Sequence, residues 1–492
     1  MNRDLSLRQS RWLLIAVIAA AAVLRFWRLG NPGLTGDESY YWLWSEHLDL
    51  SYHDHPWGVA LMIRLSTLLG GYSEAGVRWL NALLGVGAVL LVHRLGRRLF
   101  SPAAGLLAAA IVATGAPYLI TARFVFTDAL QLIILLANLL FLVPLLAEEN
   151  DRPSSPAIWG AAITMALLFN TKYSAYIYAV SVLVLILWNR AGLLRDRRIW
   201  WGTALALTGL APTLIWNATH DWSSFRWQIH HFTSTSLAET PALIRMVHLA
   251  DYLTLPVALF ALLGCIGPLD RRRRLLLVPA ALLVLPVALG PADSPRNVTS
   301  GFVLLIILAA GTVLRWYHAD RRRPAAALAI AAIGASAVIG AGTVRATLQP
   351  TAWPHSPVAR AVRLDGSGWD RVDELGLDGS RTVFAIDYSL AGQLRYYTGL
   401  PVYSSWPQFR LWGRPDLDDV TVLAFDFIDP ALVSTRLGAA FRHVSGPEQV
   451  MLGAGEGQRT VHRWRVSGCL VEEASFYEMF DLIGLVRRAQ AE

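Results

Sequence analysis

Long apolar runs separated by polar loops fill the first 345 residues of this 492-residue chain. A run of roughly 20 apolar residues crosses the hydrocarbon layer of a membrane as a helix. Runs of this length or slightly shorter predict about eleven spans, near residues 12–27, 79–95, 104–120, 129–146, 157–170, 174–188, 201–217, 248–266, 274–290, 300–315 and 325–342. The first run has no small-residue cleavage site, so we interpret it as an anchor and not as a removed signal peptide.

The pattern changes after Arg345, where charged and turn residues become more frequent. Residues 382–386 and 420–425 carry the β-branched and aromatic side chains typical of strands. We therefore expect a transmembrane domain over residues 1–345 and a small soluble α/β domain over residues 346–492. Residues 38–47 and 57–69 are aromatic or apolar but too short to span, and they predict helices lying at the membrane interface.

Composition supports an α-helical polytopic membrane protein. Hydrophobic residues make up 54% of the chain and charged residues 16%, against about 25% charged residues in a typical soluble domain. This balance excludes a disordered chain, a collagen and a nucleic-acid binder.

The net charge of +7 comes mainly from arginines clustered between the apolar runs. Cytoplasmic loops carry an excess of arginine and lysine, so we expect a multi-pass protein of the cell (inner) membrane with its N-terminus in the cytoplasm. The C-terminal domain is then periplasmic or extracellular. The loops expected outside lie at residues 28–78, 121–128, 171–173, 218–247 and 291–299.

The first of these outer loops contains several acids. Asp37 and Glu38 begin a predicted interfacial helix that also contains Tyr41, and Asp54 lies between two histidines, of which His55 precedes a proline. Carboxylates placed in this way could act as a base or hold a divalent ion, although Asp37 could also be a simple helix cap. A His-x-His pair without a third ligand is a poor zinc signature, so we expect that no metal is required, while a divalent cation could bind near Asp37, Asp54 and His55.

Two further outer turns combine acids and cations. Arg123 and Asp128 flank the outer end of the fourth predicted span, where an ionisable residue is costly and suggests a role. Lys172 is the only lysine among 43 basic residues, and Tyr173 follows it. Lys172 could be an interfacial anchor, but arginine serves that purpose elsewhere in the chain, so we favour contact with a phosphate group.

The loop after the seventh predicted span is rich in tryptophan, which is typical of a membrane interface. Its polar residues include His220, Asp221, Arg226 and His230, and Arg296 adds a cation at the start of the tenth predicted span. An arginine can bind a phosphate group through two parallel hydrogen bonds.

These motifs together resemble the GT-C membrane glycosyltransferases, in particular the bacterial relatives of the dolichyl-phosphate-mannose protein mannosyltransferases and the lipid A aminoarabinose transferase. The resemblance covers about residues 10–345 and is carried by Asp37-Glu38, Asp54-His55-Pro56, Thr127-Asp128, Lys172-Tyr173 and His220-Asp221-Trp222. It implies a polyprenyl-phosphate sugar donor presented from the external leaflet and an external glycan, lipid or protein acceptor. The aminoarabinose transferase has a lysine where this chain has His55, a departure that leaves the sugar open.

The resemblance also implies roles for residues. Asp37 is expected to be the catalytic carboxylate, with Asp128 assisting it in a single displacement that inverts the anomeric centre. The residues expected to bind the substrates are Glu38, Tyr41, Asp54, His55, Arg123, Lys172, Tyr173, His220, Asp221, Arg226, His230 and Arg296.

Two other classes of function compete with a transferase. A transporter or lipid flippase usually concentrates ionisable residues near the bilayer midplane, often in two related halves. Here the ionisable residues gather at one predicted face and the sequence shows no internal repeat. A polymer ligase or an assembly scaffold would also have large outer loops, but paired acids with nearby cations favour a transferase.

Overall fold

The computed structural model describes residues 7–148, 153–234, 254–289, 295–319, 321–353, 355–453 and 458–480. The chain divides into two compact units. The first unit consists of Met1–Leu29, Asp49–Ser66 and Arg78–Val344, and the second of Gly30–Leu48, Thr67–Val77 and Arg345–Glu492. The second unit thus combines the C-terminal part of the chain with two pieces of the first predicted outer loop.

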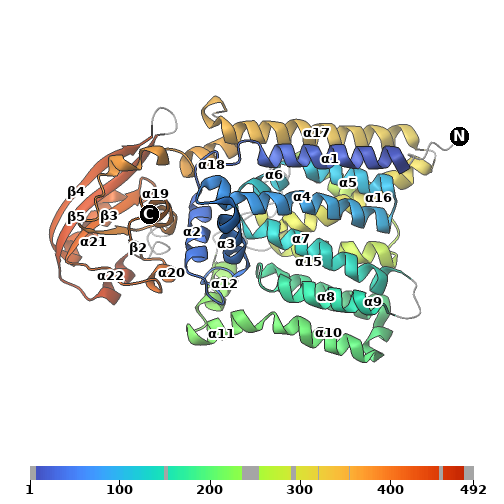
Figure 1. The fold of residues 1–492 in the computed structure, drawn as a ribbon, viewed down its shortest axis with the longest axis horizontal. Helices are drawn as coiled ribbons and strands as arrows, with labels where there is room; N and C mark the ends of the chain where they lie inside the picture. Colours follow the sequence, from blue (N-terminus) through green and yellow to red (C-terminus); the bar gives the residue numbers. More distant parts are fainter. Residues whose placement is uncertain are drawn as a thin grey trace. The chain divides into compact units, whose positions relative to one another are not determined.

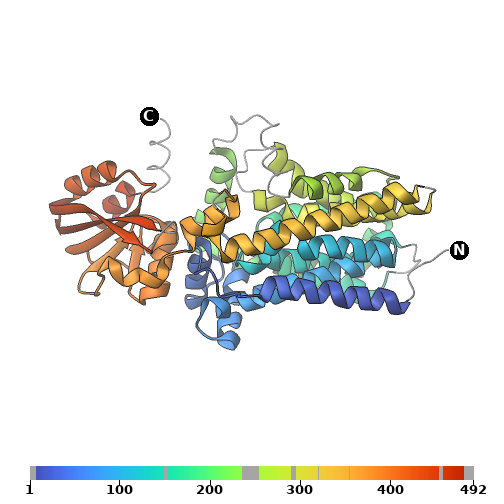
Figure 2. The ribbon, with the colours of Figure 1, turned by 90° about the horizontal axis from the view of Figure 1, so that it is seen from above.

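The first unit is a bundle of helices whose longest members run along a common direction (Figures 1 and 2). The helices that lie wholly or mostly in it are α1 (Leu7–Phe26), α3 (Gly58–Gly70), α4 (Glu74–Leu99), α5 (Pro102–Thr114), α6 (Ala116–Arg123), α7 (Thr127–Leu142), α8 (Ser155–Leu168), α9 (Ser174–Arg190), α10 (Arg197–Thr208), α11 (Ala211–Thr219), α12 (Ser223–Ser234), α14 (Leu255–Leu262), α15 (Arg271–Leu289), α16 (Thr299–His318) and α17 (Arg322–Leu348). The short helical segments are η1 (Val143–Ala147), η2 (Ala191–Arg195), η4 (Leu263–Cys265) and η5 (Pro295–Val298).

Among the described residues, seven helices are long and apolar enough to cross a membrane, or eight if the bent pair α5 and α6 is one span. The sequence predicts about eleven spans. The difference arises because α8 and the helix Leu255–Cys265 are shorter and because α15 begins with four arginines. Part of the eighth predicted run, residues 248–253, lies outside the described residues.

Burial separates the helices at the centre of the bundle from those at its edge. The most apolar window of α16 is 89% buried, whereas those of α1 and α17 are 11% and 22% buried. The side chains left exposed on these outer helices include Trp12, Ile15, Ile330 and Val338. An apolar surface of this kind is suited to contact with lipid rather than with water.

Two buried arginines tie the first helix to the bend between α5 and α6, whose axes differ by 61°. Pro117 has no N–H group to bond back to Ala113. The Arg25 guanidinium of α1 donates instead to the carbonyl oxygens of Ala113 (2.8 Å) and Val112 (3.3 Å). In return, Arg123 of α6 donates to three carbonyl oxygens at the end of α1, those of Leu24, Arg25 and Trp27, which would otherwise lack partners.

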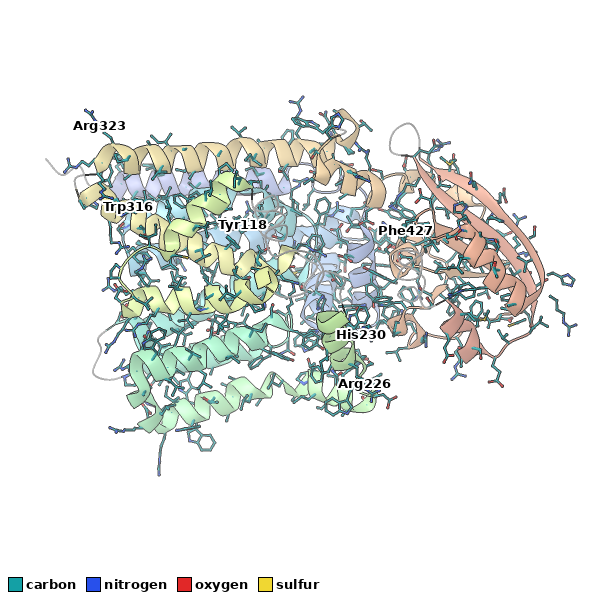
Figure 3. The ribbon with its side chains drawn as sticks, turned by 180° about the vertical axis from the view of Figure 1, so that it is seen from behind. Tyr118, Arg226, His230, Trp316, Arg323 and Phe427 are labelled. Carbon is teal, nitrogen blue, oxygen red and sulfur yellow. The ribbon has the colours of Figure 1, made fainter. Side chains whose placement is uncertain are left out.

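In the first unit, the described parts of loops that are predicted on opposite sides of the membrane lie at opposite ends of the bundle. Figure 3 shows Trp316 and Arg323 at one end and Arg226 and His230 at the other. At the arginine-rich end, the Arg272 guanidinium donates to the carbonyl oxygen of Leu99. The alternation of loops read from the sequence thus agrees with the arrangement of the helices.

The second unit contains a five-stranded sheet with the order β2-β1-β3-β5-β4. The strands are β1 (Thr382–Ala385), β2 (Val402–Ser404), β3 (Asp419–Phe425), β4 (Phe441–Leu452) and β5 (Arg459–Cys469). β2, β1 and β3 are parallel, whereas β5 and β4 are antiparallel to their neighbours. The two strands predicted at residues 382–386 and 420–425 are confirmed as β1 and β3.

The helices of the second unit are α2 (Gly36–Glu46), α18 (Pro357–Asp365), α19 (Tyr388–Thr398), α20 (Pro407–Arg410), α21 (Pro430–Ala440) and α22 (Glu473–Met479), with the short turns η6 (Pro350–Ala352) and η7 (Trp369–Leu375). Phe384, Val422 and Trp464 on one face of the sheet belong to the same apolar core as Leu437 of α21 and Phe476 of α22.

Helix α2 packs directly against α19. A Cβ atom added to Gly36 would come within 2.1 Å of the Ser389 Cβ atom, and one added to Gly392 would lie 2.9 Å from the Ser39 hydroxyl. The two helices therefore approach so closely that each needs a glycine at the contact.

Candidate functional site

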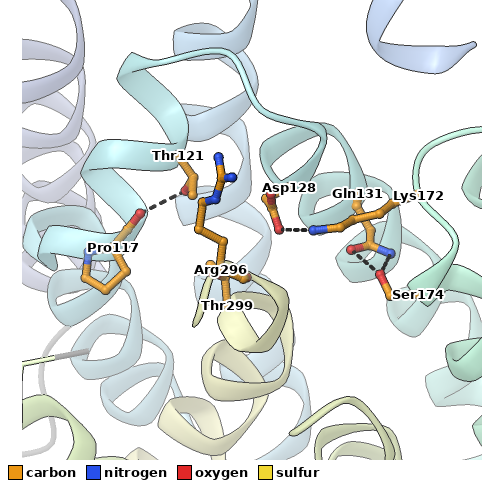
Figure 4. Close-up of polar contacts among 8 residues, drawn as sticks. All are labelled: Pro117, Thr121, Asp128, Gln131, Lys172, Ser174, Arg296 and Thr299. Atoms are coloured by element: carbon orange, nitrogen blue, oxygen red, sulfur yellow. Dashed lines mark hydrogen bonds and ion pairs between the residues drawn. The ribbon is translucent and has the colours of Figure 1, made fainter. Parts of the chain in front are cut away.

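The buried ion pair between Asp128 and Lys172 is the centre of the candidate site in the first unit. The Lys172 ammonium lies 2.9 Å from the Asp128 carboxylate, and the two side chains are only 11% and 6% exposed. Asp128 is the second residue of α7, where the helix N-terminus favours negative charge. Lys172 lies in the turn between α8 and α9, so the packing of three helices brings the pair together (Figure 4).

Polar groups surround this pair on two sides. Gln131, one turn along α7, exchanges hydrogen bonds with the hydroxyl of Ser174 at 2.8 and 3.1 Å. Arg296 rises from η5 toward the space between Thr121 and Asp128 (Figure 4). Its guanidinium carbon lies 4.2 Å from the centre of the Phe126 ring, a cation–π contact that orients the side chain.

A tight turn of the first outer loop rests on this end of the bundle. Tyr52 N donates to the carbonyl oxygen of His55 at 3.0 Å, and Gly58 N donates to that of Asn170 at 2.8 Å, two residues before Lys172. A Cβ atom on residue 58 would lie 2.3 Å from the same Asn170 oxygen. Glycine at position 58 thus lets the loop that contains Asp54 and His55 approach the turn that contains Lys172.

Residues of α11 and α12 also form hydrogen bonds with the loop that contains Asp54. The Trp216 indole donates to Asp49 at 2.9 Å, and the Gln228 amide donates to the carbonyl oxygen of Asp54 at 2.8 Å. Tyr173 shares a short hydrogen bond with Ser224 at the start of α12. Burial raises the pKa of the Tyr173 phenol, with a smaller contribution from the nearby negative charge of Asp54.

The predicted residues at the corner between α11 and α12 differ in exposure. His220 stacks on Trp216, and its Nδ1 lies 2.8 Å from the Trp216 carbonyl oxygen. Asp221 adopts a left-handed backbone conformation with φ of 52° and is exposed. Arg226 and His230 are exposed on α12 (Figure 3).

Asp37, Glu38 and Tyr41 lie on α2 and therefore belong to the second unit. The Glu38 carboxylate accepts from the Thr35 N–H at 3.0 Å, which completes a capping box, and Glu38 is fully buried. Asp37 is partly exposed and accepts a hydrogen bond from the Tyr388 hydroxyl at 3.1 Å. Tyr41 packs against Trp44 with ring centres 4.8 Å apart.

Two more carboxyl groups lie close enough to Asp37 for electrostatic repulsion. Asp365 accepts a hydrogen bond from Gly36 N at 2.8 Å. Burial raises the pKa of Asp365 to about 7, with smaller contributions from the negative charges of Asp37 and Glu38, while Arg459 and the Gly36 N–H oppose this rise. Burial also raises the pKa of Asp387, again with a contribution from Asp37.

No sequence motif identified Tyr388, Asp365 or Asp387 as neighbours of Asp37, because they lie more than 300 residues later in the chain. Within the described part of the chain, no group of three His, Cys, Asp or Glu side chains is arranged to hold a metal ion.

An apolar cavity of about 320 Å³ lies among helices α7 to α10 of the first unit. Leu142, Met165, Phe169 and Val182 contribute to its wall, and Asn138 is one of its few polar residues. The cavity suits a flexible hydrocarbon chain.

Comparison with known proteins agrees with this architecture. The family described as dolichyl-phosphate-mannose-protein mannosyltransferase matches residues 54–216. The lipid A galacturonosyltransferase RgtD of Rhizobium johnstonii is 27% identical over 191 residues, which are 39% of this chain. The match spans only 40% of that relative's length.

Two crystal structures of ArnT from Cupriavidus metallidurans, one apo and one bound to undecaprenyl phosphate, superpose with a TM-score of 0.60. They are 13% and 14% identical to this chain and align with 92% of it and 98% of their own length. The predicted resemblance is therefore confirmed: the chain has the fold of the GT-C membrane glycosyltransferases, and part of it matches the mannosyltransferase family.

Proposed function

We propose that the protein is a membrane glycosyltransferase that moves a sugar from a polyprenyl phosphate to a hydroxyl group of a lipid acceptor. The observation that carries this proposal is the fold shared with ArnT over nearly the whole chain, since one ArnT structure holds undecaprenyl phosphate. The name of the matched relative, a lipid A galacturonosyltransferase, supports an acceptor of the lipid A type.

The donor needs cations for its phosphate and an apolar place for its tail. When the sugar leaves, the lipid phosphate gains negative charge, which positioned cations stabilise. Lys172 and Arg296 are proposed to supply them, because both lie beside Asp128 at one end of the bundle. The apolar cavity among α7 to α10 is proposed to accept part of the isoprenoid chain.

The acceptor hydroxyl must lose its proton, and Asp37 is proposed to take it. Asp37 is partly exposed, and Tyr388 holds its carboxylate with one hydrogen bond. Asp128 is proposed to assist the reaction, and a single displacement would invert the anomeric centre. We propose that no metal ion or organic cofactor takes part, so a chelator should leave the rate unchanged.

We also propose that the protein lies in the cell (inner) membrane, with its N-terminus in the cytoplasm and its C-terminal unit outside. Within residues 40–56, cysteines introduced at the exposed positions 46–50 should then react with an impermeant reagent in intact cells. Cysteines at residues 271–274 should react only after permeabilisation. The reverse pattern would overturn the orientation.

A comparison of cells with and without the protein tests the proposed function. Mass spectrometry should find that the mutant cells accumulate a polyprenyl-phosphate sugar and lack one decoration on a surface glycolipid. Complementation with the wild-type chain should restore both lipids. The proposal would be contradicted if cells that express the protein and cells that lack it contained the same lipids.

A further inference from the structure

A small polar pocket opens on the sheet of the second unit, and none of the residues of the proposed reaction lines it. Its volume is about 150 Å³, and it lies beneath the loop that joins η7 to β1. The wall includes three arginines, Arg381, Arg463 and Arg465, together with Asp378 and Ser380 of the loop.

The register of the strands explains why these side chains converge. Val383 of β1 pairs with Thr421 of β3, which in turn pairs with Arg465 of β5. Side chains two residues apart point to the same face of a strand, so Arg463 and Arg465 project on the same side as Thr421. Because Thr421 is small, a hollow remains between the arginines and the loop.

The arginines are held in different ways. Arg463 is 10% exposed, donates to Glu448 at 2.6 Å and also contacts the carbonyl oxygen of Leu375. Arg381 forms an ion pair of 2.7 Å with Asp419. Arg465 is exposed, and its charge interacts with that of Glu448. It makes no hydrogen bond or ion pair with any residue that the structure describes, so its guanidinium has donors to offer.

The charge of the wall favours an anion. Three arginines and one aspartate leave an excess of two positive charges on the lining. Glu448 and Asp419 lie outside the lining, and their side chains are 59% and 48% exposed. Water screens such exposed charges strongly, so they offset the arginines only in part.

The size of the pocket favours a phosphate group over a carboxylate. Its volume corresponds to roughly five water molecules at about 30 Å³ each, which is enough for a tetrahedral anion and part of the group that carries it. Arginine guanidinium groups bind phosphate oxygens through paired, charge-assisted hydrogen bonds.

We propose that this pocket binds a phosphate monoester, with Arg465 as its free donor and Arg463 as a fixed one. The phosphate is either carried by a glycolipid or free in solution. Binding is measured without a sugar donor, so this proposal can fail while the transfer reaction proposed above stands, and the reverse.

Calorimetric titration of the purified full-length protein in detergent tests the proposal, with inorganic phosphate as the first probe. Arg465→Gln keeps a polar side chain but removes the charge, and we expect it to weaken phosphate binding about tenfold. Arg442→Gln is the matched control, because Arg442 is an exposed arginine on the neighbouring strand β4 and does not line the pocket. It should bind phosphate like the wild type.

A second titration distinguishes the sources by using a phosphorylated glycolipid and the same lipid after phosphatase treatment. Tighter binding of the phosphorylated lipid than of inorganic phosphate supports a lipid-borne group, and equal binding supports the free anion. The proposal is overturned if the wild type binds neither probe or if Arg465→Gln binds both as well as the wild type does.

Discussion

Replacing the two members of the Asp128–Lys172 pair, singly and together, separates a structural role of Lys172 from a role in binding the donor. Lys172→Met removes the cation and leaves a carboxylate with an exposed fraction of only 6%. Removing one partner of a buried pair typically costs about 3 to 5 kcal/mol, so we expect the single variant to lose much of its free energy of unfolding. The double variant Asp128→Asn/Lys172→Met has no buried charge at this position and should recover most of that loss.

The variants should rank differently in their affinity for the lipid phosphate than in their stability. Asp128→Asn removes a negative neighbour and leaves Lys172 without its partner carboxylate, so polyprenyl phosphate should bind more tightly than to the wild type. The double variant lacks the ammonium and should bind about 10- to 100-fold more weakly, as expected for a lost charge-assisted hydrogen bond of about 1.5 to 3 kcal/mol.

The assay is the direct binding of polyprenyl phosphate to each purified variant, with thermal unfolding measured on the same samples. Lys172→Arg is the conservative control, because it keeps the charge but changes the shape of the cation. A double variant that binds the lipid like the wild type would show that Lys172 does not contact the lipid phosphate and has a purely structural role.

Three further predictions concern the second unit. Asp37→Asn keeps the shape of the side chain that Tyr388 contacts but removes the carboxylate that is proposed to act as the base. Turnover should fall about 10²- to 10⁴-fold, whereas Glu38→Gln should lose less. A fully active Asp37→Asn protein would show that another group takes the proton. Asp365 binds its proton more tightly in the folded state, where its pKa is about 7, than in the unfolded state, where it is about 3.9. The stability of the second unit should therefore fall as the pH rises from 4 to 7. Thermal unfolding of Asp365→Asn should show a smaller loss of stability over this pH range. The same loss as in the wild type would exclude Asp365 as its cause. Gly36→Ala should destabilise the unit by about 1 to 3 kcal/mol through the clash with Ser389. In denaturant titrations, adding Ser389→Gly to this variant should restore part of the lost stability. If Gly36→Ala is as stable as the wild type, α2 does not pack closely on α19.

The apolar runs were readable from the sequence because the length of a membrane helix and the arginine content of its loops are local properties. For the same reason β1 and β3 could be recognised from their side chains alone. The number of spans depends on where the shorter helices begin and end, and α8 is only 14 residues long.

The sequence does not predict which residues the predicted site residues contact, because these contacts depend on how distant helices pack together. Asp128 and Lys172 were expected at the same end of the bundle, but their ion pair depends on how α7 packs against the turn before α9. Arg123 was expected to bind substrate. In the structure its guanidinium donates to carbonyl oxygens at the end of α1, a contact that the sequence does not indicate. Tyr388 and Asp365 reach Asp37 only because α2 joins the C-terminal part of the chain in one compact unit.

Sugar transfer from a polyprenyl phosphate can be followed in a transfer assay with the purified full-length protein in detergent. A labelled polyprenyl-phosphate sugar and a lipid A-type acceptor are mixed with the protein in the absence of any membrane gradient, and both lipids are followed over time. We predict that label moves from the donor to the acceptor at a rate proportional to the protein concentration, and that the double variant Asp128→Asn/Lys172→Met shows almost none of this transfer. An intact donor in the detergent assay, combined with movement of the unchanged lipid across the membrane of vesicles that contain the protein, would show that the protein is a flippase and not a transferase.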